Sequence, residues 1–402
     1  MLQSQLLTKT SKTIPKEATT TSHQLLLRAG FIRPLTAGVF CFLPLGWRVY
    51  KKLENLIRDE LNAIGCQEVF LPVLIPADLW KKTNRWETMD PPLFKLKDRH
   101  NKWFGLGSTH EEVITELVKD HIFSYKDLPQ ALYQIQIKFR NEIRTSGGLL
   151  RTKEFFMKDL YSFHQSEADL KNFYREVEGA YQKIFTSCEL KAVAVKAHSG
   201  SIGGEKSQEF MVLAETGEDK ILFCRNCGWG ANIELGEGKE KCPVCQAKLE
   251  LKNTIEIGHL FELGSLYSQK LNATFVDQKG KKKFLVMGCY GLGLPRIIST
   301  VVETSHDENG IIWPKKLSPF DYHLLSFERD KETLKVYKAL IKNGKEVLFD
   351  DRSISPGEKL KDADLIGIYR RLIISQKTKD MIEYKERGKK KMRLIKLQDL
   401  IS

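Results

Sequence analysis

The spacing of apolar residues predicts both helices and strands in the first half of the chain. In residues 47–64 the apolar positions recur at helical spacing, and Gly65 marks the predicted end of that helix. Residues 68–74 follow as a predicted strand. Residues 167–186 predict a second long helix, and residues 192–197 predict another strand.

A strand, a loop and a second strand are predicted in the middle of the chain. Residues 135–140 alternate apolar and polar side chains, which is typical of a half-buried strand. Residues 146–148 (Ser-Gly-Gly) predict a flexible break, and an apolar strand resumes at residues 155–160.

Charged side chains follow the first of these strands. We expect Arg140, Glu142 and Arg144 on one face, because side chains alternate along a strand. One interpretation is a ladder of exposed ion pairs, which contributes little stability. The other is a polyphosphate platform, with arginines on the phosphates, Glu142 accepting from a nucleobase amine or a ribose, and Phe155 stacked on a base.

The second half begins with two predicted strands. Residues 257–264 form one, and residues 284–296 join the other to a glycine-rich turn that precedes a helix at residues 297–303. Taken alone, the pair Gly291 and Gly293 is weak evidence for a phosphate loop.

The last 80 or so residues alternate between strand and helix patterns. Strands are predicted at residues 322–327, 346–349 and 372–375, and helices at residues 332–342 and 359–365. This order predicts a small α/β domain with right-handed crossovers.

Charge and composition narrow the class of protein. The net charge of +13 and a pI of about 9.2 suit a polyanionic partner, a property that many basic proteins share. No run of about 18 uncharged apolar residues occurs, so we expect no membrane span. Residues 1–21 lack the apolar core of a secretory signal, so we expect no cleaved leader.

The cysteines predict a metal site. Four of the eight form two C-x-x-C pairs, Cys224 with Cys227 and Cys242 with Cys245, separated by fourteen residues. Four thiolates complete a tetrahedral zinc site and leave no open position, so the ion would be structural. The spacing disfavours the alternative, a chance cluster of reduced thiols. A reducing, cytoplasmic compartment explains this usage better than a disulfide framework.

The central segment resembles motif 2 of the class II aminoacyl-tRNA synthetases. It reads F-R-x-E at residues 139–142, then a loop, then R-T-x-E-F-x-M-K-D-x-Y-S-F at residues 151–163. In this detailed form the chain is similar to the bacterial-type prolyl-tRNA synthetases over essentially its whole length. The resemblance implies an α+β fold with an antiparallel-sheet catalytic core, a small zinc-ribbon insert and a C-terminal α/β anticodon-binding domain.

The resemblance divides the chain into four parts. Residues 1–221 would form the first part of the catalytic core with motifs 1 and 2, and residues 222–252 the zinc ribbon. Residues 253–316 would complete the core with motif 3, and residues 317–402 would bind the anticodon. The basic tail, residues 385–396, is either a solvated face or a contact to tRNA phosphates.

Two further motifs support the resemblance. The helix and strand of residues 47–74 match motif 1, the dimer interface of class II synthetases, with Pro72 as the matching proline. A homodimer is therefore implied. Residues 291–296 match motif 3, G-x-G-x-x-R, in which Arg296 meets the terminal phosphate of ATP.

Thr109 and Glu111 have two interpretations. A Ser or Thr followed by Glu before an apolar run is typical of a helix N-cap. The same residues match a T-x-E element of the family that holds the amino end of proline, and a hydroxyl and a carboxylate suit a secondary ammonium. His110 between them is expected to form local hydrogen bonds.

The remaining site residues follow from the motifs and from strand alternation. For ATP with Mg2+ the resemblance implies Arg140, Glu142, Arg151, Phe155 and Arg296, with Arg140 and Arg296 as catalytic residues. For proline it implies Thr109, Glu111 and Arg140. Further candidates for the proline pocket, in part from alternation beside Phe155, are Met157, Asp159, Tyr161, His259 and Cys289. Ordinary core packing is the alternative for Met157 and Tyr161.

The resemblance implies ATP-dependent attachment of L-proline to tRNA(Pro) through prolyl-adenylate. Bacterial relatives carry a large domain that hydrolyses mischarged alanyl-tRNA where this chain has only the ribbon, so cis-editing is expected to be absent. One alternative is a non-catalytic tRNA-binding paralogue, although its decay would remove charged clamps that are all present here. Another is a class II synthetase for threonine, serine or glycine; a threonine enzyme would place catalytic zinc on core Cys and His residues, unlike this ribbon.

Overall fold

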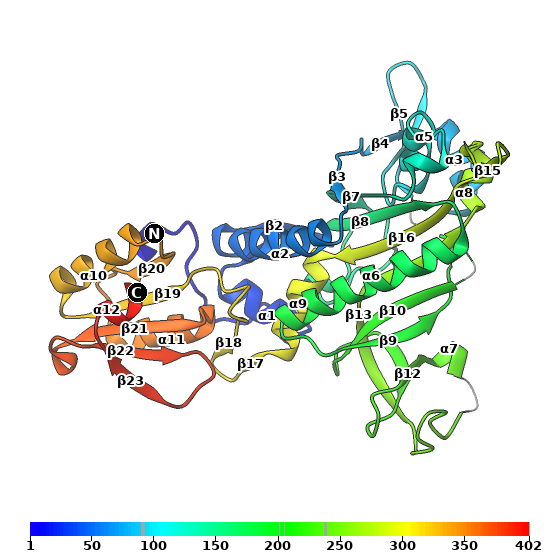
Figure 1. The fold of residues 1–402 in the computed structure, drawn as a ribbon. Helices are drawn as coiled ribbons and strands as arrows, with labels where there is room; N and C mark the ends of the chain where they lie inside the picture. Colours follow the sequence, from blue (N-terminus) through cyan, green and yellow to red (C-terminus); the bar gives the residue numbers. More distant parts are fainter. Residues whose placement is uncertain (90–92, 201, 205, 237–238, 402) are drawn as a thin grey trace.

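The computed structural model describes residues 1–89, 93–200, 202–204, 206–236 and 239–401. Two lobes are visible in Figure 1, a larger one built on an extended sheet and a smaller one that contains both ends of the chain. No helix of the described ranges is long and apolar enough to cross a bilayer.

A nine-stranded sheet forms the frame of the larger lobe. Its pairs are antiparallel except for β3 with β7, and β10 pairs with both β13 and β9. The other strands follow the order β12 (Gly230–Asn232), β11 (Asp219–Phe223), β13 (Glu250–Gly264), β16 (Val286–Gly293), β8 (Glu154–His164), β7 (Gln130–Phe139) and β3 (Gln67–Glu68), while β10 is Lys206–Leu213 and β9 is Ala192–Ala197.

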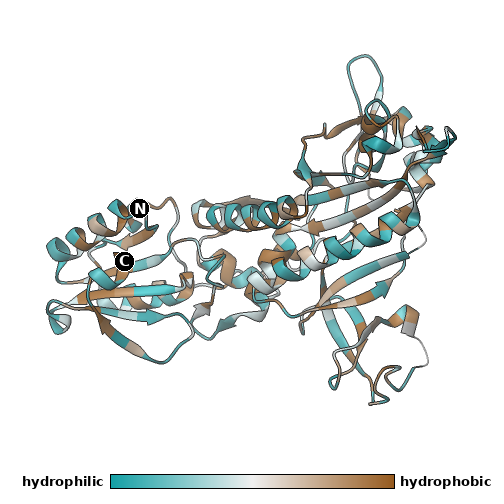
Figure 2. Cartoon of the chain, viewed as in Figure 1, coloured by the Kyte–Doolittle hydropathy of each residue, from teal (hydrophilic) through white to brown (hydrophobic). Residues whose placement is uncertain are grey.

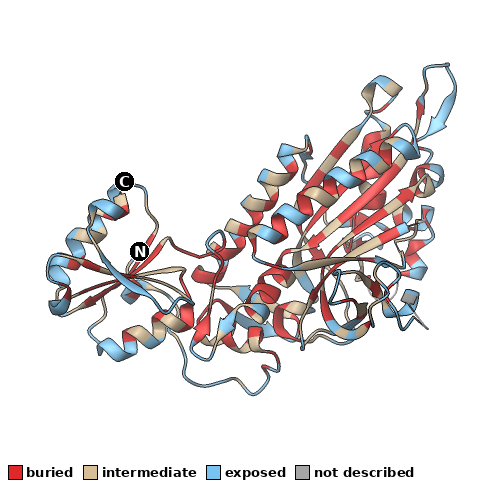
Figure 3. Ribbon diagram, turned by 60° about the horizontal axis from the view of Figure 1, so that its bottom comes forward, coloured by how far each residue is buried: buried red, intermediate tan, exposed pale blue. Residues whose placement is uncertain are grey.

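Long helices cover one face of this sheet. They are α2 (Pro44–Ala63), α6 (Glu167–Ser187) and α9 (Leu294–Thr304), with α1 (Thr21–Arg28) beside α9. Their apolar stripes bury against the strands, while the outward stripe of α6 is hydrophilic in Figure 2. Figure 3 shows the buried residues concentrated between helices and sheet, which fixes the strands that carry the site.

Short elements connect and flank this frame. At the far end of the larger lobe, β4, β6 and β5 form a three-stranded sheet near α3, α4, α5 and α8. The bounds are η1 (Gln3–Gln5), β1 (Ile32–Thr36), β2 (Val39–Phe42), β4 (Leu74–Pro76), α3 (Ala77–Lys82), α4 (Arg85–Thr88), β5 (Lys95–Lys97), β6 (Trp103–Leu106), α5 (Glu111–Lys119), η2 (Tyr125–Asp127), η3 (Gly148–Leu150), α7 (Ile233–Gly236), α8 (Leu266–Leu271), β14 (Thr274–Val276), β15 (Lys282–Phe284), β17 (His306–Asp307) and β18 (Gly310–Ile311).

The smaller lobe is an α/β domain, as its sequence pattern predicts. A five-stranded sheet has the order β20, β19, β21, β22, β23, in which β20, β19 and β21 are mutually parallel. The bounds are β19 (Tyr322–Phe327), α10 (Asp330–Lys342), β20 (Val347–Asp350), α11 (Pro356–Ile366), β21 (Arg370–Ser375), η4 (Gln376–Thr378), β22 (Ile382–Glu386), β23 (Met392–Ile395) and α12 (Gln398–Ile401).

The prediction of one strand over residues 68–74 is wrong for residues 69–73, because β3 ends at Glu68 and β4 begins only at Leu74. Side chains take over the hydrogen bonds of a ladder there. The backbone N–H of Leu71 donates to Oε1 of Gln134 (3.1 Å), and Nε2 of Gln136 donates to the carbonyl of Leu71 (3.0 Å). The segment therefore follows β7 without being a strand.

Candidate active site

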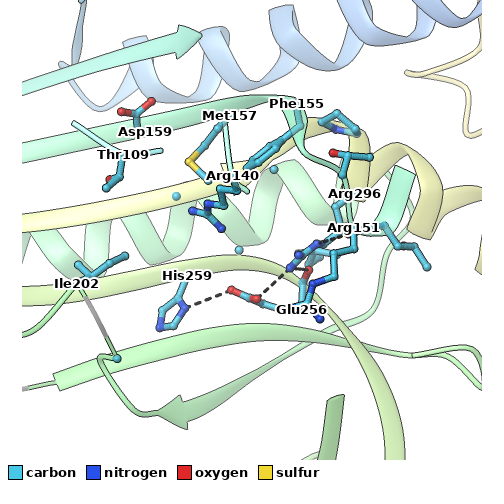
Figure 4. A pocket seen from close by; sticks show the side chains of 18 of the residues that line it. Thr109, Arg140, Arg151, Phe155, Met157, Asp159, Ile202, Glu256, His259 and Arg296 are labelled. Atoms are coloured by element: carbon cyan, nitrogen blue, oxygen red, sulfur yellow. Dashed lines mark hydrogen bonds and ion pairs between the residues drawn. The ribbon is translucent and has the colours of Figure 1, made fainter. Parts of the chain in front are cut away.

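One cleft on the open face of the large sheet collects most of the predicted site residues. Its lining includes ten of them: Thr109, Arg140, Glu142, Arg151, Phe155, Met157, Asp159, His259, Cys289 and Arg296. Figure 4 shows Thr109 and Asp159 toward one end, Arg140 in the middle, and Arg151 and Arg296 toward the other end. The two remaining candidates, Glu111 and Tyr161, lie behind Thr109.

Strand register explains why these residues meet. On β8 the alternate residues Phe155, Met157 and Asp159 share the cleft face, and Asp159 stands opposite Gly291 of β16. A Cβ on Gly291 would meet no other heavy atom within 4 Å, so this glycine leaves open space in the cleft floor. The period-two interpretation of β8 is therefore confirmed.

Arg140 is not on a strand, so the prediction that it shares a strand face with Glu142 and Arg144 is wrong. β7 ends at Phe139, and the N–H of Glu142 donates to the carbonyl of Arg140 (2.8 Å) in a tight turn. The guanidinium carbon of Arg140 lies 5.3 Å from the ring centre of Phe155. Within the described ranges its guanidinium makes no hydrogen bond or ion pair. Burial, followed by the charge of Arg296, lowers its pKa.

Arg296 is held rigidly at the outer end of the cleft. Its Nη1 lies 2.9 Å from Oε2 of Glu256, and its Nε donates to the carbonyl of Leu150 (3.0 Å). His259 Nδ1 lies 3.2 Å from Oε1 of the same Glu256. Burial would raise the pKa of Glu256, but the hydrogen bond with His259 and the charge of Arg296 lower it to about 2. Glu256 is therefore a carboxylate that lies between the guanidinium of Arg296 and the imidazole of His259.

The alternation of side chains along β13 does not place Glu256 in the cleft, because a β-bulge interrupts the strand. In a regular strand, Glu256 and His259 would point to opposite faces. The pairing of β13 with β10 shifts register between Phe210, opposite Gly258, and Met211, opposite Glu256. The extra residue, Ile257, brings Glu256 and His259 to the same cleft.

Arg151 is shared by two carboxylates near the mouth of the cleft. Its Nε lies 3.0 Å from Glu142 and its Nη1 lies 3.1 Å from Glu218, which also accepts from the hydroxyl of Ser146. Glu218 follows β10 and has no counterpart among the predicted site residues. The side chain of Arg151 is about half exposed, so a ligand can replace its two carboxylate partners at little cost in free energy.

The inner end of the cleft holds a buried carboxylate. The hydroxyl of Thr109 donates to the carboxylate of Glu111 (2.6 and 2.7 Å), and Sγ of Cys289 lies 3.3 Å from the same group. Thr109 therefore does not cap α5, whose N-cap residue is His110. The N–H of His110 instead donates to the hydroxyl of Tyr161 (2.9 Å).

A buried polar network supports this end from below. Lys138 is fully buried, and its ammonium lies 2.9 Å from Asp159 and donates to Nδ1 of His110 (2.8 Å). Tyr161 donates to Asp159 (2.9 Å), and Nε2 of His110 donates to the carbonyl of Pro72 (3.0 Å). Burial and the neighbouring Lys138 lower the pKa of His110 to about 4, so the ring is neutral and acts as a local hydrogen-bonding group, as expected.

The same network corrects the burial expected along β7. Gln136 and Lys138 are buried, whereas Ile135, Ile137 and Phe139 are only half-buried. The polar positions of this strand therefore face the site network, and the alternation alone does not show which face is covered.

In the part of the chain that the structure describes, two clusters offer ligands for a metal ion. The Sγ atoms of Cys224, Cys227, Cys242 and Cys245 all lie within 4.8 Å of one another, close to the separation of about 3.8 Å that Zn–S bonds of about 2.3 Å give in a tetrahedron. The second cluster is Glu209, Glu256 and His259. Only the first has the donor set of a structural zinc site.

Two family models match the chain. Residues 94–305 match the tRNA synthetase class II core domain (G, H, P, S and T), and residues 322–402 match an anticodon binding domain. The proline–tRNA ligase of Halothermothrix orenii is 36% identical over 557 aligned positions, which cover 100% of this chain and 98% of the relative. That of Dehalococcoides mccartyi is 33% identical over 556 positions, with the same coverage.

The chain belongs to the prolyl-tRNA synthetase family. A prolyl-tRNA synthetase of Cryptosporidium parvum, solved with halofuginone and AMPPNP, shares the fold with a TM-score of 0.78 at 17% identity, covering 95% of this chain and 75% of that one. The same enzyme with L-proline and AMP gives a TM-score of 0.76 at 16% identity. The class II core and the anticodon-binding domain expected from the sequence are thereby confirmed.

Some residues at the cleft were not marked by the sequence motifs. Glu256 and Glu218 pair with the arginines, and His198, Ser199 and Ile202 line the wall beyond His259. The glycines near residues 199–204 were the available signal, because they let the backbone approach a ligand closely.

Proposed function

We propose that this protein attaches L-proline to tRNA(Pro) in two steps, with the cleft as the site of both. One observation carries the proposal. A single cleft has a hydroxyl with a buried carboxylate behind it at one end and two arginines at the other end. In its middle lies the guanidinium of Arg140, which has no hydrogen-bonding or ion-pair partner among the described residues. This order matches the ammonium, carboxylate and polyphosphate of an amino acid placed in line with ATP.

In the first step, the proline carboxylate attacks the α-phosphorus of ATP and pyrophosphate leaves. The carboxylate is already a nucleophile, so the chain needs no general base and contributes positioning and charge. Thr109 and Glu111 would hold the proline ammonium. Arg140 would bridge the carboxylate and the α-phosphate, where negative charge develops. Met157 and His259 would line the space around the proline ring.

The nucleotide would occupy the outer half of the cleft. Phe155 would stack on adenine, and Glu142 would accept from its amine after releasing Arg151. Arg151 and Arg296 would then clamp the outer phosphates. Mg2+ bound with ATP would neutralise phosphate charge, and Glu256 offers the carboxylate oxygen that this ion prefers.

In the second step, a ribose hydroxyl of the terminal tRNA adenosine attacks the acyl carbon of prolyl-adenylate, and AMP leaves. The lobe around β19–β23 would bind the anticodon. Its exposed lysines between residues 385 and 396 would meet tRNA phosphates. The domain boundaries inferred from the sequence, at residues 221, 252 and 316, are part of this proposal.

We propose that the ribbon binds a structural zinc ion. We also propose that the chain does not edit mischarged tRNA in cis, because the ribbon stands where bacterial relatives have an editing domain. The alignment with the H. orenii enzyme runs over 557 positions, whereas this chain has 402 residues, so a long stretch of the relative has no counterpart here. The segment between α7 and β13 is correspondingly short.

We further propose a cytoplasmic homodimer formed through motif 1. Phe70 and Leu35 are 79% and 74% exposed, and Trp47 of α2 is also exposed. Large apolar side chains that remain exposed near motif 1 support an interface at this surface.

Proline-dependent exchange of labelled pyrophosphate into ATP tests the proposal, with alanine, threonine, serine and glycine run in parallel. We expect exchange with proline, weaker exchange with alanine and none with the others. Alanyl-tRNA(Pro) formed by the protein should also survive incubation with it, since the proposed function does not include cis-editing. Exchange with no amino acid, from a folded protein, would instead support the tRNA-binding paralogue.

A further inference from the structure

Arg85 is a buried cation that the reaction outlined above does not use. It opens α4 and is 5% exposed. Its Nη1 lies 2.8 Å from Oε2 of Glu111 and 3.0 Å from both carboxylate oxygens of Glu112. Its guanidinium carbon lies 5.4 Å from the ring centre of Trp80 and 5.5 Å from that of Tyr267. Two aromatic rings and two carboxylates therefore fix its position.

This contact determines the state of Glu111 behind the cleft. Glu111 is fully buried, and a buried carboxylate stays ionised only if cations and hydrogen-bond donors compensate for the lost water. Thr109 donates to it from the cleft side, and Arg85 binds it from the opposite side. Arg85 supplies the only full positive charge in direct contact with it among the described residues.

We propose that Arg85 is a positioning residue for proline binding, because its guanidinium keeps Glu111 ionised and oriented toward the cleft before the substrate arrives. The inference rests on the proposed function, since it takes Glu111 as the partner of the proline ammonium. A preformed carboxylate costs no reorganisation when the ammonium enters.

The two glutamates on Arg85 are not equivalent. Burial would raise the pKa of Glu111, but Arg85 and the Thr109 hydroxyl lower it below its usual range. Burial raises the pKa of Glu112, and the charge of Glu111 adds to this. Glu112 therefore takes up a proton more readily, and Glu111 remains the anion.

Other titratable groups surround Glu111 and are the same in R85M, R85K and R387M. They are His110 at the N-cap of α5, Lys138 on β7, Tyr161 on β8, Cys289 on β16, Tyr267 on α8 and Arg140 in the turn after β7. Because they are unchanged, a shift in pH dependence after substitution of Arg85 reports on the Arg85–Glu111 pair.

Loss of Arg85 should shift the pH dependence of proline binding to higher pH. Proline binding needs ionised Glu111, so it is lost as pH falls through the pKa of that group. Without Arg85, burial is no longer offset, the pKa of Glu111 rises, and binding is lost at a higher pH. One pKa unit corresponds to about a tenfold change in the affected population.

The test is pyrophosphate exchange with R85M, R85K and R387M at pH 6 and pH 8. For R85M we expect the KM for proline to rise about tenfold or more at pH 8 and further at pH 6, with the KM for ATP within about twofold of wild type. R85K keeps the charge but lacks the planar guanidinium that lies over Trp80 and Tyr267, so its KM for proline should rise by a similar factor at both pH values. R387M is the matched control, because the side chain of Arg387 is only 8% exposed and also pairs with two carboxylates, Asp307 and Asp364, but follows β22 in the smaller lobe, away from the cleft.

The outcomes distinguish failure of the proposed function from failure of the positioning role of Arg85. A wild-type protein without proline-dependent exchange overturns the proposed function and this inference with it. An active wild type beside R85M with unchanged KM for proline at both pH values overturns the inference alone. So does an equal loss for ATP and proline in R85M and R387M, which would indicate a purely structural role. If R85M does not fold, R85K decides, and a wild-type KM for proline in that variant overturns the inference.

Discussion

Replacement of Arg140 by methionine is expected to slow proline-dependent pyrophosphate exchange by a hundredfold to about a thousandfold. This is the range found when one preorganised donor to a developing negative charge is removed. The guanidinium of Arg140 is ready for that task, since it has no hydrogen-bonding partner within the described residues and lies over the ring of Phe155. The effect should fall mainly on kcat, because the α-phosphate gains charge in the transition state.

The same substitution should not destabilise the fold. Burial and the nearby Arg296 both disfavour the charge of Arg140, so the folded protein holds this cation at a cost. We therefore expect R140M to have a melting temperature equal to or above that of wild type. R175M, on the exposed side of α6, is the control and should keep both activity and stability. Activity within threefold of wild type in R140M would contradict the proposed role.

The sequence predicted the fold well where pattern and pairing are local. The long helices, the strands β8, β13 and β16 and the part of the α/β lobe from β19 to β21 follow from apolar periodicity, because each element buries one continuous stripe. The strands β22 and β23 and the helix α12 were not predicted. The prediction failed at residues 69–73, where buried glutamines replace ladder hydrogen bonds. Hydrophobic periodicity carries no information about such side-chain substitutes.

The candidate site was predictable to the extent that strict alternation holds. Phe155, Met157 and Asp159 follow it on β8. Glu256 does not, because a bulge puts it on the face of His259, and a bulge has no signature in the alternation of β13.

Contacts between distant segments were also beyond the sequence pattern. Arg85 reaches Glu111 from a separate short helix, 26 residues earlier in the chain. Arg151 likewise meets Glu218, which lies 67 residues later in the chain. Such pairs depend on how helices and loops dock onto the sheet, which the motifs of either segment alone do not specify.

If the ribbon holds zinc as proposed, loss of the ion should unfold the ribbon while sparing the core. The ribbon buries only a small apolar cluster around Cys224, Cys242 and Leu249, too little to hold about 30 residues in place without a metal. In zinc-finger peptides the ion contributes about 10–16 kcal/mol to folding. We therefore expect C242S to lose nearly all of one bound zinc per chain and to become sensitive to proteolysis between residues 224 and 249.

Unfolding of the ribbon should reduce catalysis only moderately, because the cleft residues of β13 lie away from the ribbon end of that strand. This strand pairs with β11 at the ribbon end and carries Glu256 and His259 in the cleft, so unfolding of the ribbon leaves β13 supported by β10 and β16. Pyrophosphate exchange by C242S should fall by no more than about tenfold, far less than in R140M. C41S, which replaces an exposed cysteine away from the ribbon, should keep the zinc and the protease resistance of wild type. Full zinc content in C242S, measured by atomic emission on dialysed protein, would show that the four thiolates do not form the metal site.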